Sequence, residues 1–329
     1  MTVDAKILKI LRAAGEEAVS GAELAQQTGA SRAVIRGRID ALRALGYDIE
    51  ASPHLGYRLL ASPDLLHADE LASRLGKTRV IGRDIHVFQE TTSTNDVIEK
   101  FARDNVKEGV VVFAESQTKG RGRLGRKWAS PARKGLWFSV LLRPELTPQE
   151  TTQITVASAT TLRRAIHAQT GVKAEIKWPN DILVNGKKIA GILTELHAEL
   201  DRVKSVILGI GVDVNLAASD FPAEVRKIAT SLKIELGHAV SRADLAVSIL
   251  RELDTDYAQV VTRRFITVAD EWEEHCSTLG RNVTIRLGER QVRGRAESLA
   301  EDGALLVRTE HGHLERIVGG DLTVEKGPA

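Results

Sequence analysis

The sequence predicts an α+β chain of several domains: a winged helix-turn-helix, a central α/β core and a small C-terminal β-barrel. Three observations support this prediction. Helical periodicity near the N-terminus gives way to a strand-like hairpin, strands and helices alternate through the middle, and short β-patterned runs fill the end. We therefore expect domains at residues 1–62, 68–275 and 276–329.

The first domain has the pattern of a winged helix-turn-helix. Apolar residues recur at helical spacing in 5–14 and 32–45, and Gly29 lies in the turn before the longer helix. Strand-like segments at 47–50 and 57–60 then form a hairpin that would serve as the wing.

The longer helix of this head is net basic. Ser31 is placed to cap it, and Arg32 and Arg36 are four residues apart, so both can face a major groove. We predict DNA contacts from Ser31, Arg32, Arg36 and Arg38. Winged helices also serve as protein-contact modules, and that alternative stays open.

The central segment alternates two kinds of pattern. Its strand-like runs are 110–114, 136–142 and 203–214, and its helical runs are 95–103, 151–169 and 242–265. This alternation predicts a sheet large enough to hold a site. The last domain contains short β-patterned runs at 283–287, 291–299, 304–309 and 313–317. Turn residues separate them, which is typical of a small barrel, and nothing in them indicates catalysis.

Composition narrows the classes of function. Of 329 residues, 43% are hydrophobic and 27% charged, as in ordinary globular proteins. The net charge of +2 indicates that any nucleic-acid site is a local patch. Cys276 is the single cysteine, which excludes an intrachain disulfide and fits a reducing cytoplasm. No apolar run approaches the roughly 20 residues of a membrane helix, and no secretory signal is evident.

The basic, glycine-rich stretch at 119–134 is the most informative part of the chain. It holds seven basic residues and no acidic one. Glycines let the backbone approach a ligand, and arginines offer forked donors to phosphate or carboxylate. We expect a mobile loop that orders over an anion, with a solvated surface loop as the alternative.

The same stretch matches the G-x-G-x-x-G dinucleotide fingerprint at Gly120, Gly122 and Gly125, but we reject that interpretation. The fingerprint needs a helix that opens at its third glycine, and residues 128–131 start a helix poorly. The chain has no P-loop motif either, so phosphates would be held by side chains and by this loop.

A hairpin is predicted around Asn185-Gly186, a strong type I′ turn signal. The turn would pair Asp181 with Ala190 and bring Asp181 within reach of Lys188. A neighbouring acid and lysine suit acyl chemistry, although a surface salt bridge is the common alternative. Gly191 leaves room for a flat ligand or for tight strand packing.

Taken together, these stretches resemble the biotin protein ligase family. The matching residues are Ser93-Thr94-Asn95, Gln117, 120–123, Lys177-Trp178-Pro179-Asn180-Asp181 and Lys188-x-Ala190-Gly191. The resemblance covers essentially the whole chain, and the head matches the bifunctional bacterial subgroup that represses biotin-synthesis genes. It implies a core related to class II aminoacyl-tRNA synthetases and an SH3-like C-terminal barrel.

The resemblance also implies what the protein does. It would activate biotin with ATP and Mg²⁺ to biotinyl-5′-AMP, and transfer biotin to a lysine of the carboxyl carrier protein of acetyl-CoA carboxylase. With biotin as corepressor it would bind operator DNA as a homodimer favoured by the adenylate, in the cytoplasm and away from membranes. The rival readings are a non-enzymatic ligand-sensing regulator and a lipoate or octanoate transferase; the basic loop argues against both.

Residue roles follow from the same resemblance. Biotin would contact Ser93, Thr94, Asn95, Gln117, Arg121, Gly122, Arg123, Lys188 and Gly191. ATP would contact Arg121, Arg123, Trp128, Asn180 and Lys188. The catalytic set would be Lys188, Arg123 and Asp181, and Mg²⁺ would lie near Asn180 and Asp181. The strand glycines Gly209 and Gly211 would admit the ligand close to the backbone.

Two positions depart from the family's pattern. Leu124 stands where many relatives have a third arginine, and Asp213 stands where asparagine is usual. We expect either change to alter nucleotide affinity, because one removes a cation and the other replaces an amide with an acid.

Overall fold

The computed structural model describes residues 1–199 and 202–325, which form two compact units. One unit comprises 1–77 and 241–247, and the other comprises 78–240 and the described residues from 248 onward. The first unit extends past the predicted head boundary because the helix α4 (Ala68–Leu75) packs against α1. The boundaries at 62, 68 and 275 therefore remain predictions.

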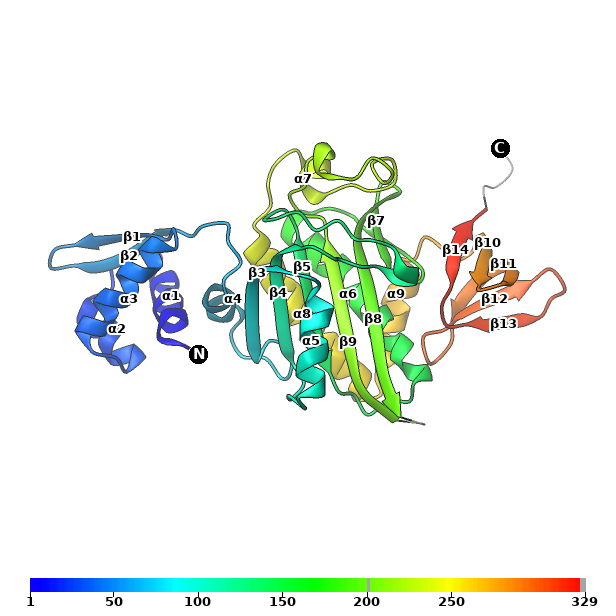
Figure 1. Ribbon diagram of the computed structural model, residues 1–329, viewed down its shortest axis with the longest axis horizontal. Coiled ribbons are helices and arrows are strands. Elements are labelled where there is room, and N and C mark those ends of the chain that lie inside the picture. Colours follow the sequence, from blue (N-terminus) through cyan, green and yellow to red (C-terminus); the bar gives the residue numbers. More distant parts are fainter. Residues whose placement is uncertain (200–201, 326–329) are drawn as a thin grey trace. The chain divides into compact units, whose positions relative to one another are not determined.

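The first unit contains the predicted winged helix-turn-helix. Its elements are α1 (Val3–Ala14), α2 (Gly21–Thr28), α3 (Arg32–Ala44), β1 (Asp48–Ser52) and β2 (Gly56–Ala61), with β1 and β2 antiparallel (Figure 1). Ser20 and Ser31 cap α2 and α3 by accepting hydrogen bonds from the amides of Glu23 and Val34. Gly29 ends α2 in the left-handed conformation, with φ 77°.

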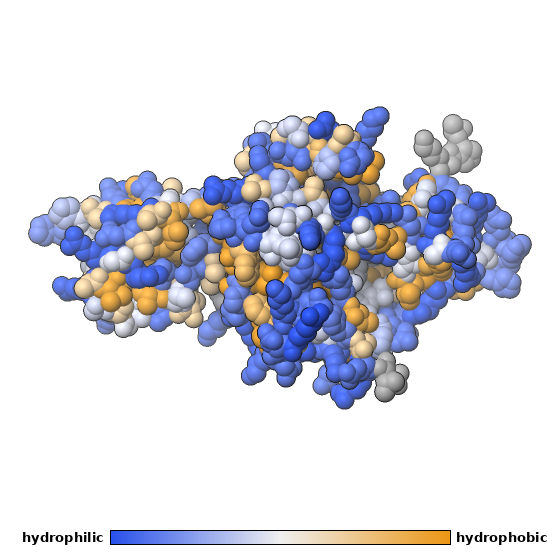
Figure 2. All heavy atoms as spheres, in the orientation of Figure 1, coloured by the Kyte–Doolittle hydropathy of each residue, from blue (hydrophilic) through white to orange (hydrophobic). Residues whose placement is uncertain are grey.

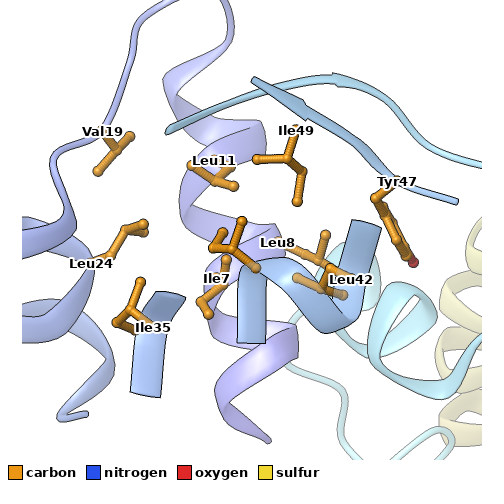
Figure 3. Packing of buried hydrophobic residues seen from close by; sticks show 10 residues of the cluster. Ile7, Leu8, Leu11, Val19, Leu24, Ile35, Leu42, Tyr47 and Ile49 are labelled. Atoms are coloured by element: carbon orange, nitrogen blue, oxygen red, sulfur yellow. The ribbon is translucent and has the colours of Figure 1, made fainter. Parts of the chain in front are cut away.

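Apolar side chains from the three helices and the hairpin fill one core in this unit (Figure 3). The buried members are Ile7, Leu8, Leu11, Val19, Leu24, Ile35, Ile39, Leu42, Tyr47 and Ile49. On α3 they recur every three or four residues, so the opposite face of that helix is left to solvent.

Glu70 of α4 joins this helix to the head. Its carboxylate is 1% exposed and accepts hydrogen bonds from Arg12 at 2.8 Å, Arg74 at 2.6 Å and the Tyr47 hydroxyl at 3.0 Å. The two arginines compensate the buried charge, so α4 is fixed to α1 and to the start of the wing.

The second unit is built on a seven-stranded sheet with the order β3-β4-β5-β9-β8-β7-β6. Only β3 and β4 are parallel. The strands are β3 (Asp84–Thr91), β4 (Val110–Gln117), β5 (Leu136–Leu142), β6 (Glu175–Lys177), β7 (Asp181–Val184), β8 (Lys187–Glu199) and β9 (Arg202–Val212).

Helices cover the two faces of this sheet unequally (Figure 1). One face carries α5 (Thr94–Arg103), whose Ile98 packs on Leu141 of β5 and Ile207 of β9. The opposite face carries α6 (Thr152–Thr170), α8 (Arg242–Val261) and α9 (Phe265–Glu274). The short helix α7 (Leu232–Leu236) follows β9. Because α5 is short, part of its face is left for loops to cover.

Two local predictions were wrong in detail. The helical run at 242–265 is two helices, because Arg263 adopts a left-handed φ of 60° between α8 and α9. The hairpin turn is type I′ as predicted, with positive φ at both Asn185 and Gly186. However, a bulge after Ile182 pairs Asp181 with Gly191 instead of the alanine before it.

The C-terminal segment forms one five-stranded antiparallel sheet with the order β13-β12-β11-β10-β14. Its strands are β10 (Asn282–Leu287), β11 (Arg290–Leu299), β12 (Leu305–Thr309), β13 (Leu314–Ile317) and β14 (Asp321–Val324). The last strand was not predicted, since only three residues separate its start from the end of β13. It carries Asp321, which lines the cavity described next.

The surface is mixed in polarity. On the visible face, apolar residues appear as patches between polar ones (Figure 2). Within the described ranges, no helix is long and apolar enough to cross a membrane.

Candidate active site

A cavity of about 340 Å³ opens on the sheet face that α5 leaves uncovered. Its walls are formed by the N-terminus of α5, the basic loop 119–128, the β7–β8 hairpin, the end of β9 and the start of β14. Every predicted ligand-site residue outside the head lines this cavity. The predicted meeting of the basic loop with the lysine-bearing hairpin is therefore confirmed, while the ligand each residue binds remains a prediction.

One end of the cavity is polar and tightly hydrogen-bonded. Ser93, Thr94 and Asn95 are each 3% exposed at the start of α5. The side-chain oxygen of Gln117 accepts from the Thr94 amide at 2.8 Å, and the Ser139 hydroxyl lies 2.5 Å from the Asn95 oxygen. Buried donors and acceptors of this kind suit a small polar group of a ligand.

The hairpin places an acid and a lysine together, as predicted. Lys188 Nζ lies 2.5 Å from Asp181 Oδ1 and 5.1 Å from the centre of the Trp128 ring. Both charged side chains are about a quarter exposed and line the cavity. A desolvated ammonium in this position can hold a carboxylate or a phosphate oxygen.

The basic loop, which we call the flap (residues 120–127), lies folded against the cavity. Gly122 donates its amide to the Arg126 carbonyl at 2.7 Å, and the turn between them includes Leu124 at φ 57°. Leu124 is 70% exposed at the tip, so the missing arginine leaves an apolar side chain in solvent. The predicted mobility of the flap remains a prediction.

The three arginines of the flap have different partners. Arg121 pairs with Asp96 and Glu195, and Arg126 pairs with Asp321 at 2.6 Å. Within the described chain, the side chain of Arg123 donates to the Asn180 amide oxygen at 3.1 Å, which is an uncharged acceptor. Burial lowers the pKa of the Arg123 guanidinium, so this cation gains most from an incoming anion. Phosphate contacts from Arg121, as predicted, would compete with its two ion pairs.

Glycines make room for side chains at the floor of the cavity. A Cβ atom on Gly209 would lie 2.3 Å from Asn95 Oδ1, and one on Gly211 would lie 2.6 Å from the Trp128 ring. These glycines therefore admit Asn95 and Trp128. The expectation that the strand backbone at these two glycines also approaches the ligand remains a prediction.

The other end of the cavity is largely apolar, with one acid. Phe221, Val225, Ile228 and Ala229 line it. Asp213 is 5% exposed there, and burial raises the pKa of its carboxyl well above the usual range while the Lys188 charge opposes the rise. Its backbone is held by hydrogen bonds with Ile189 and Leu232.

The predicted DNA-contact residues separate into two kinds. Arg32 and Arg36 lie exposed on α3, and within the described residues neither forms an ion pair. Arg38 instead pairs with the buried Asp4 of α1, and Ser31 caps the helix. Contacts from Arg38 and Ser31 would add to these structural roles.

Sequence reasoning missed several residues of the site. Ser139, Asp96 and Glu195 complete its hydrogen-bond network, but isolated polar residues on a strand or helix carry no motif. Glu195 could have been noticed as an acid on the strand that follows the lysine-bearing hairpin. Asp321 comes from a different domain, and no local pattern indicates that.

Three family models match the chain in the predicted order. An HTH domain matches residues 4–58, the biotin/lipoate A/B protein ligase family matches 87–215, and the biotin protein ligase C-terminal domain matches 278–322. These matches cover the head, the cavity-bearing core and the C-terminal sheet.

Relatives agree with the models over nearly the whole length. The bifunctional ligase/repressor BirA of Bacillus spizizenii is 37% identical over 98% of both chains. The biotin–[acetyl-CoA-carboxylase] ligase of Paracoccus denitrificans is 34% identical over 68% of this chain and 93% of its own. A structure of Aquifex aeolicus biotin protein ligase in complex with biotin and ATP aligns with a TM-score of 0.64 at 30% identity, covering 74% of this chain and all of that one.

A winged head, a ligase core with a cation-lined cavity and the matching C-terminal sheet define the class: biotin protein ligases that carry a DNA-binding domain. Within that class, the chain belongs to the family of bifunctional ligase/repressors represented by BirA.

Proposed function

We propose that the protein makes biotinyl-5′-AMP from biotin and ATP, and then transfers biotin to a lysine of a carboxyl carrier protein. The observation that carries this proposal is one cavity that joins a buried polar end, the Lys188–Asp181 pair and the flap cation Arg123. An acyl-adenylate joins an acyl group, a mixed anhydride and a phosphate in one molecule. The polar end would bind the acyl group, the Lys188–Asp181 pair would lie at the anhydride, and Arg123 would bind the phosphate.

Biotin would occupy the polar end. Its ureido group would exchange hydrogen bonds with Ser93, Thr94 and Asn95, which are buried, and with Gln117, whose side-chain oxygen already accepts from Thr94. Its carboxylate would reach toward Lys188, past Gly191, where a Cβ atom would lie 3.0 Å from the lysine Cε. Because Gly191 has no side chain, the path of the carboxylate to Lys188 stays open.

ATP would occupy the apolar end, with its phosphates toward Arg123 and Lys188. The aromatic Trp128 and the apolar side chains of Phe221, Val225, Ile228 and Ala229 provide walls for a base. Asn180 would hold Arg123 in place through the hydrogen bond between them.

The residues present fit a magnesium ion that is shared with the nucleotide. Asp181 supplies one carboxylate at the cavity, while the Asn180 oxygen already accepts from Arg123. Magnesium usually binds one or two carboxylates together with substrate phosphates, and it neutralises charge on those phosphates. In the described part of the chain, no group of three or more His, Cys, Asp or Glu side chains forms a protein-only metal site.

In the first step, a biotin carboxylate oxygen attacks the α-phosphorus of ATP, and the bond to the pyrophosphate oxygen breaks. Negative charge grows on the phosphate oxygens, so placed cations lower the barrier. A charge pair at 4 Å is worth about 4 kcal/mol at an effective dielectric near 20. Lys188 and Arg123 are the cations that the geometry offers.

In the second step, the acceptor amine attacks the carbonyl carbon of the anhydride, and AMP leaves. A lysine amine with a pKa near 10.4 must lose a proton to react. Asp181 would accept it, because its carboxylate lies beside Lys188, the cation proposed to hold the anhydride. The flap would exclude water from the anhydride until the acceptor arrives.

The decisive experiment incubates the protein with labelled biotin, ATP and a carboxyl carrier domain. Label on the carrier that depends on ATP supports the proposal. Labelling by lipoate or octanoate in place of biotin would favour the transferase alternative. Tight biotin binding without any ATP–pyrophosphate exchange would favour a ligand-sensing regulator.

We also propose that the head represses biotin genes as part of a homodimer favoured by biotinyl-5′-AMP. A single small head binds few phosphates, so two heads reading two half-sites would be needed. The sheet offers an edge for pairing: beyond Gly191, β8 has strand neighbours only on its β9 side within the described residues.

Gel-shift with the biotin-operon DNA of the source organism, with and without biotin and ATP, tests this role. Retardation that appears only with both ligands supports a corepressor function of biotin, and ligand-independent or absent binding contradicts it. We place the reaction in the cytoplasm, where ATP and carrier proteins are available.

A further inference from the structure

We propose that Glu195 is a positioning residue that ties the flap to the polar end of the cavity, so that filling this end holds the flap closed. Glu195 lies on β8 and was not part of any motif. One of its carboxylate oxygens accepts from Asn95 Nδ2 at 2.6 Å, and both accept from the fork of Arg121 at 3.0 and 3.1 Å. The same carboxylate thus joins a cavity residue to the first arginine of the flap.

The contact with Arg121 has the geometry of a strong ion pair. Two parallel N–H···O bonds fix the direction of the guanidinium as well as its distance. Asp96 of α5 pairs with a third nitrogen of Arg121, and the hydrogen bonds of Asp96 keep its pKa lowered although burial opposes this. Two carboxylates therefore surround one cation, which makes Arg121 a poor ligand for phosphate and a good anchor for the flap.

The network continues from Glu195 to the far end of the basic loop. Asn95 contacts Ser139 at 2.5 Å, and Ser139 lies 2.7 Å from the Thr94 hydroxyl. The Thr94 amide donates to Gln117, which in turn donates to the Ser130 hydroxyl at 2.9 Å. Arg121 and Ser130 lie on either side of the flap tip, so both roots of the loop are bonded to the side chains that surround the polar end.

The backbone fixes this arrangement before any ligand arrives. Glu195 pairs with Ile207 of β9, in the regular part of the β8–β9 ladder. Gly209, two residues further along β9, leaves space that Asn95 fills. A ligand that restrains Asn95 or Gln117 would restrain the flap through shared hydrogen bonds, and loosening Glu195 would release the flap without removing a cation that faces the phosphates.

The test is Glu195→Gln in the full-length chain, with Glu199→Gln as the matched control. Glutamine keeps the size of the side chain but directs an amide toward the Arg121 donors. Glu199 lies on the same strand and pairs with exposed Lys204. Trypsin cleavage within the flap, measured with biotin and ATP present, should be about tenfold faster in Glu195→Gln, since charged hydrogen bonds are involved. Glu199→Gln should match the unmodified protein.

Adenylate retention gives a second readout. After one round of synthesis, biotinyl-5′-AMP should escape about tenfold faster from Glu195→Gln than from Glu199→Gln, because the flap over the adenylate is released. Equal proteolysis and equal retention in the two glutamine variants would overturn the proposal. Proteolysis requires no turnover, so that result would be distinct from failure of the ligase activity itself.

Arg121→Lys provides an independent variant, because it keeps the charge and the trypsin site but loses the fork. It should raise flap cleavage like Glu195→Gln, and the double variant should add little to either single change. Additive effects would show that the two residues act separately and would overturn the proposal. If Glu195→Gln lowers the melting temperature markedly, the result for Arg121→Lys at the exposed flap decides.

Discussion

The flap and the helix α3 are both rich in arginine, yet they use their charges differently. In the flap, Arg121 and Arg126 pair with carboxylates from α5, β8 and β14, and Arg123 faces the cavity against an amide. On α3, Arg38 is paired with Asp4, while Arg32 and Arg36 are exposed.

This difference shows that the composition of a basic segment does not identify the ligand that the segment binds. In each segment some arginines hold the fold and others remain available to an anion, and only the partners distinguish them. In the flap the available cation faces an enclosed cavity. On α3 the available pair faces solvent on one side of a helix, where a polyanion can reach both.

The largest effect is expected at the lysine that the flap covers. Lys188→Ala should lower biotin-dependent ATP–pyrophosphate exchange by about 100- to 1000-fold, the usual cost of removing one group that stabilises transition-state charge. Lys187→Ala, one residue earlier on the same strand and exposed, should exchange normally. Near-normal exchange in Lys188→Ala would remove this lysine from the reaction.

The next largest effect is expected on α3, where exposed Arg32 and Arg36 are compared with the paired Arg38. Replacing Arg32 and Arg36 together by alanine should weaken operator binding about 100-fold and reduce the salt dependence of binding by about two ion equivalents. Arg38→Ala should instead lower the melting temperature, since it leaves Asp4 buried without its partner. Titrations at several salt concentrations measure the first, and thermal unfolding the second. Equal DNA affinity in the double variant would show that this face does not contact DNA.

Within the flap, substitutions of Arg123, which faces the cavity, and of Arg126, which is paired, should change the rate of adenylate formation to different extents. Arg123→Ala should reduce adenylate formation about 10- to 100-fold, because a desolvated cation is lost from the phosphates. Arg126→Ala removes an exposed pair with Asp321, so its effect should stay within a few-fold. Rapid-quench measurement of biotinyl-5′-AMP compares them, and equal losses would refute the distinction drawn here.

The smallest effect is expected at Asp213, a buried acid that forms no ion pair within the described residues. Folding raises the pKa of Asp213, so the unfolded chain releases this proton at a lower pH than the folded chain. Stability contributed by the protonated form is full below pH 4 and falls as pH rises toward the folded pKa. Asp213→Asn should therefore stabilise the protein at pH 7, because asparagine carries no charge to bury, and the gain should shrink at low pH.

Urea unfolding at pH 5 and pH 8 checks this last expectation. The gain from Asp213→Asn should be larger at pH 8, whereas Glu224→Gln, an exposed acid on the neighbouring loop, should change little at either pH. A gain that does not grow with pH would mean that Asp213 is ionised in the folded protein.

Much of the fold was accessible from sequence because its signals are local. Caps at Ser20 and Ser31, the Asn185-Gly186 turn and the apolar run at 136–142 each act within a few residues. The bulge after Ile182 and the break at Arg263 were missed because neither disturbs the local apolar pattern.

The site divides in the same way. Lys188 and Asp181 were placed by a turn and a strand register, so their proximity followed from local geometry. Glu195 and Asp321 reach the flap from distant parts of the chain, and only the tertiary structure brings them there. Long-range pairing of this kind leaves no periodic trace in a sequence.

The position of Trp128 makes its intrinsic fluorescence a reporter of ligand binding. Its indole packs over the bare backbone of Gly211, stands edge-on to Trp137 at 6.4 Å and lies beside an ammonium group. A molecule that binds beneath the loop would change the surroundings of this ring. Intrinsic fluorescence should therefore follow loading of the enzyme in real time, without a dye and before any product is formed.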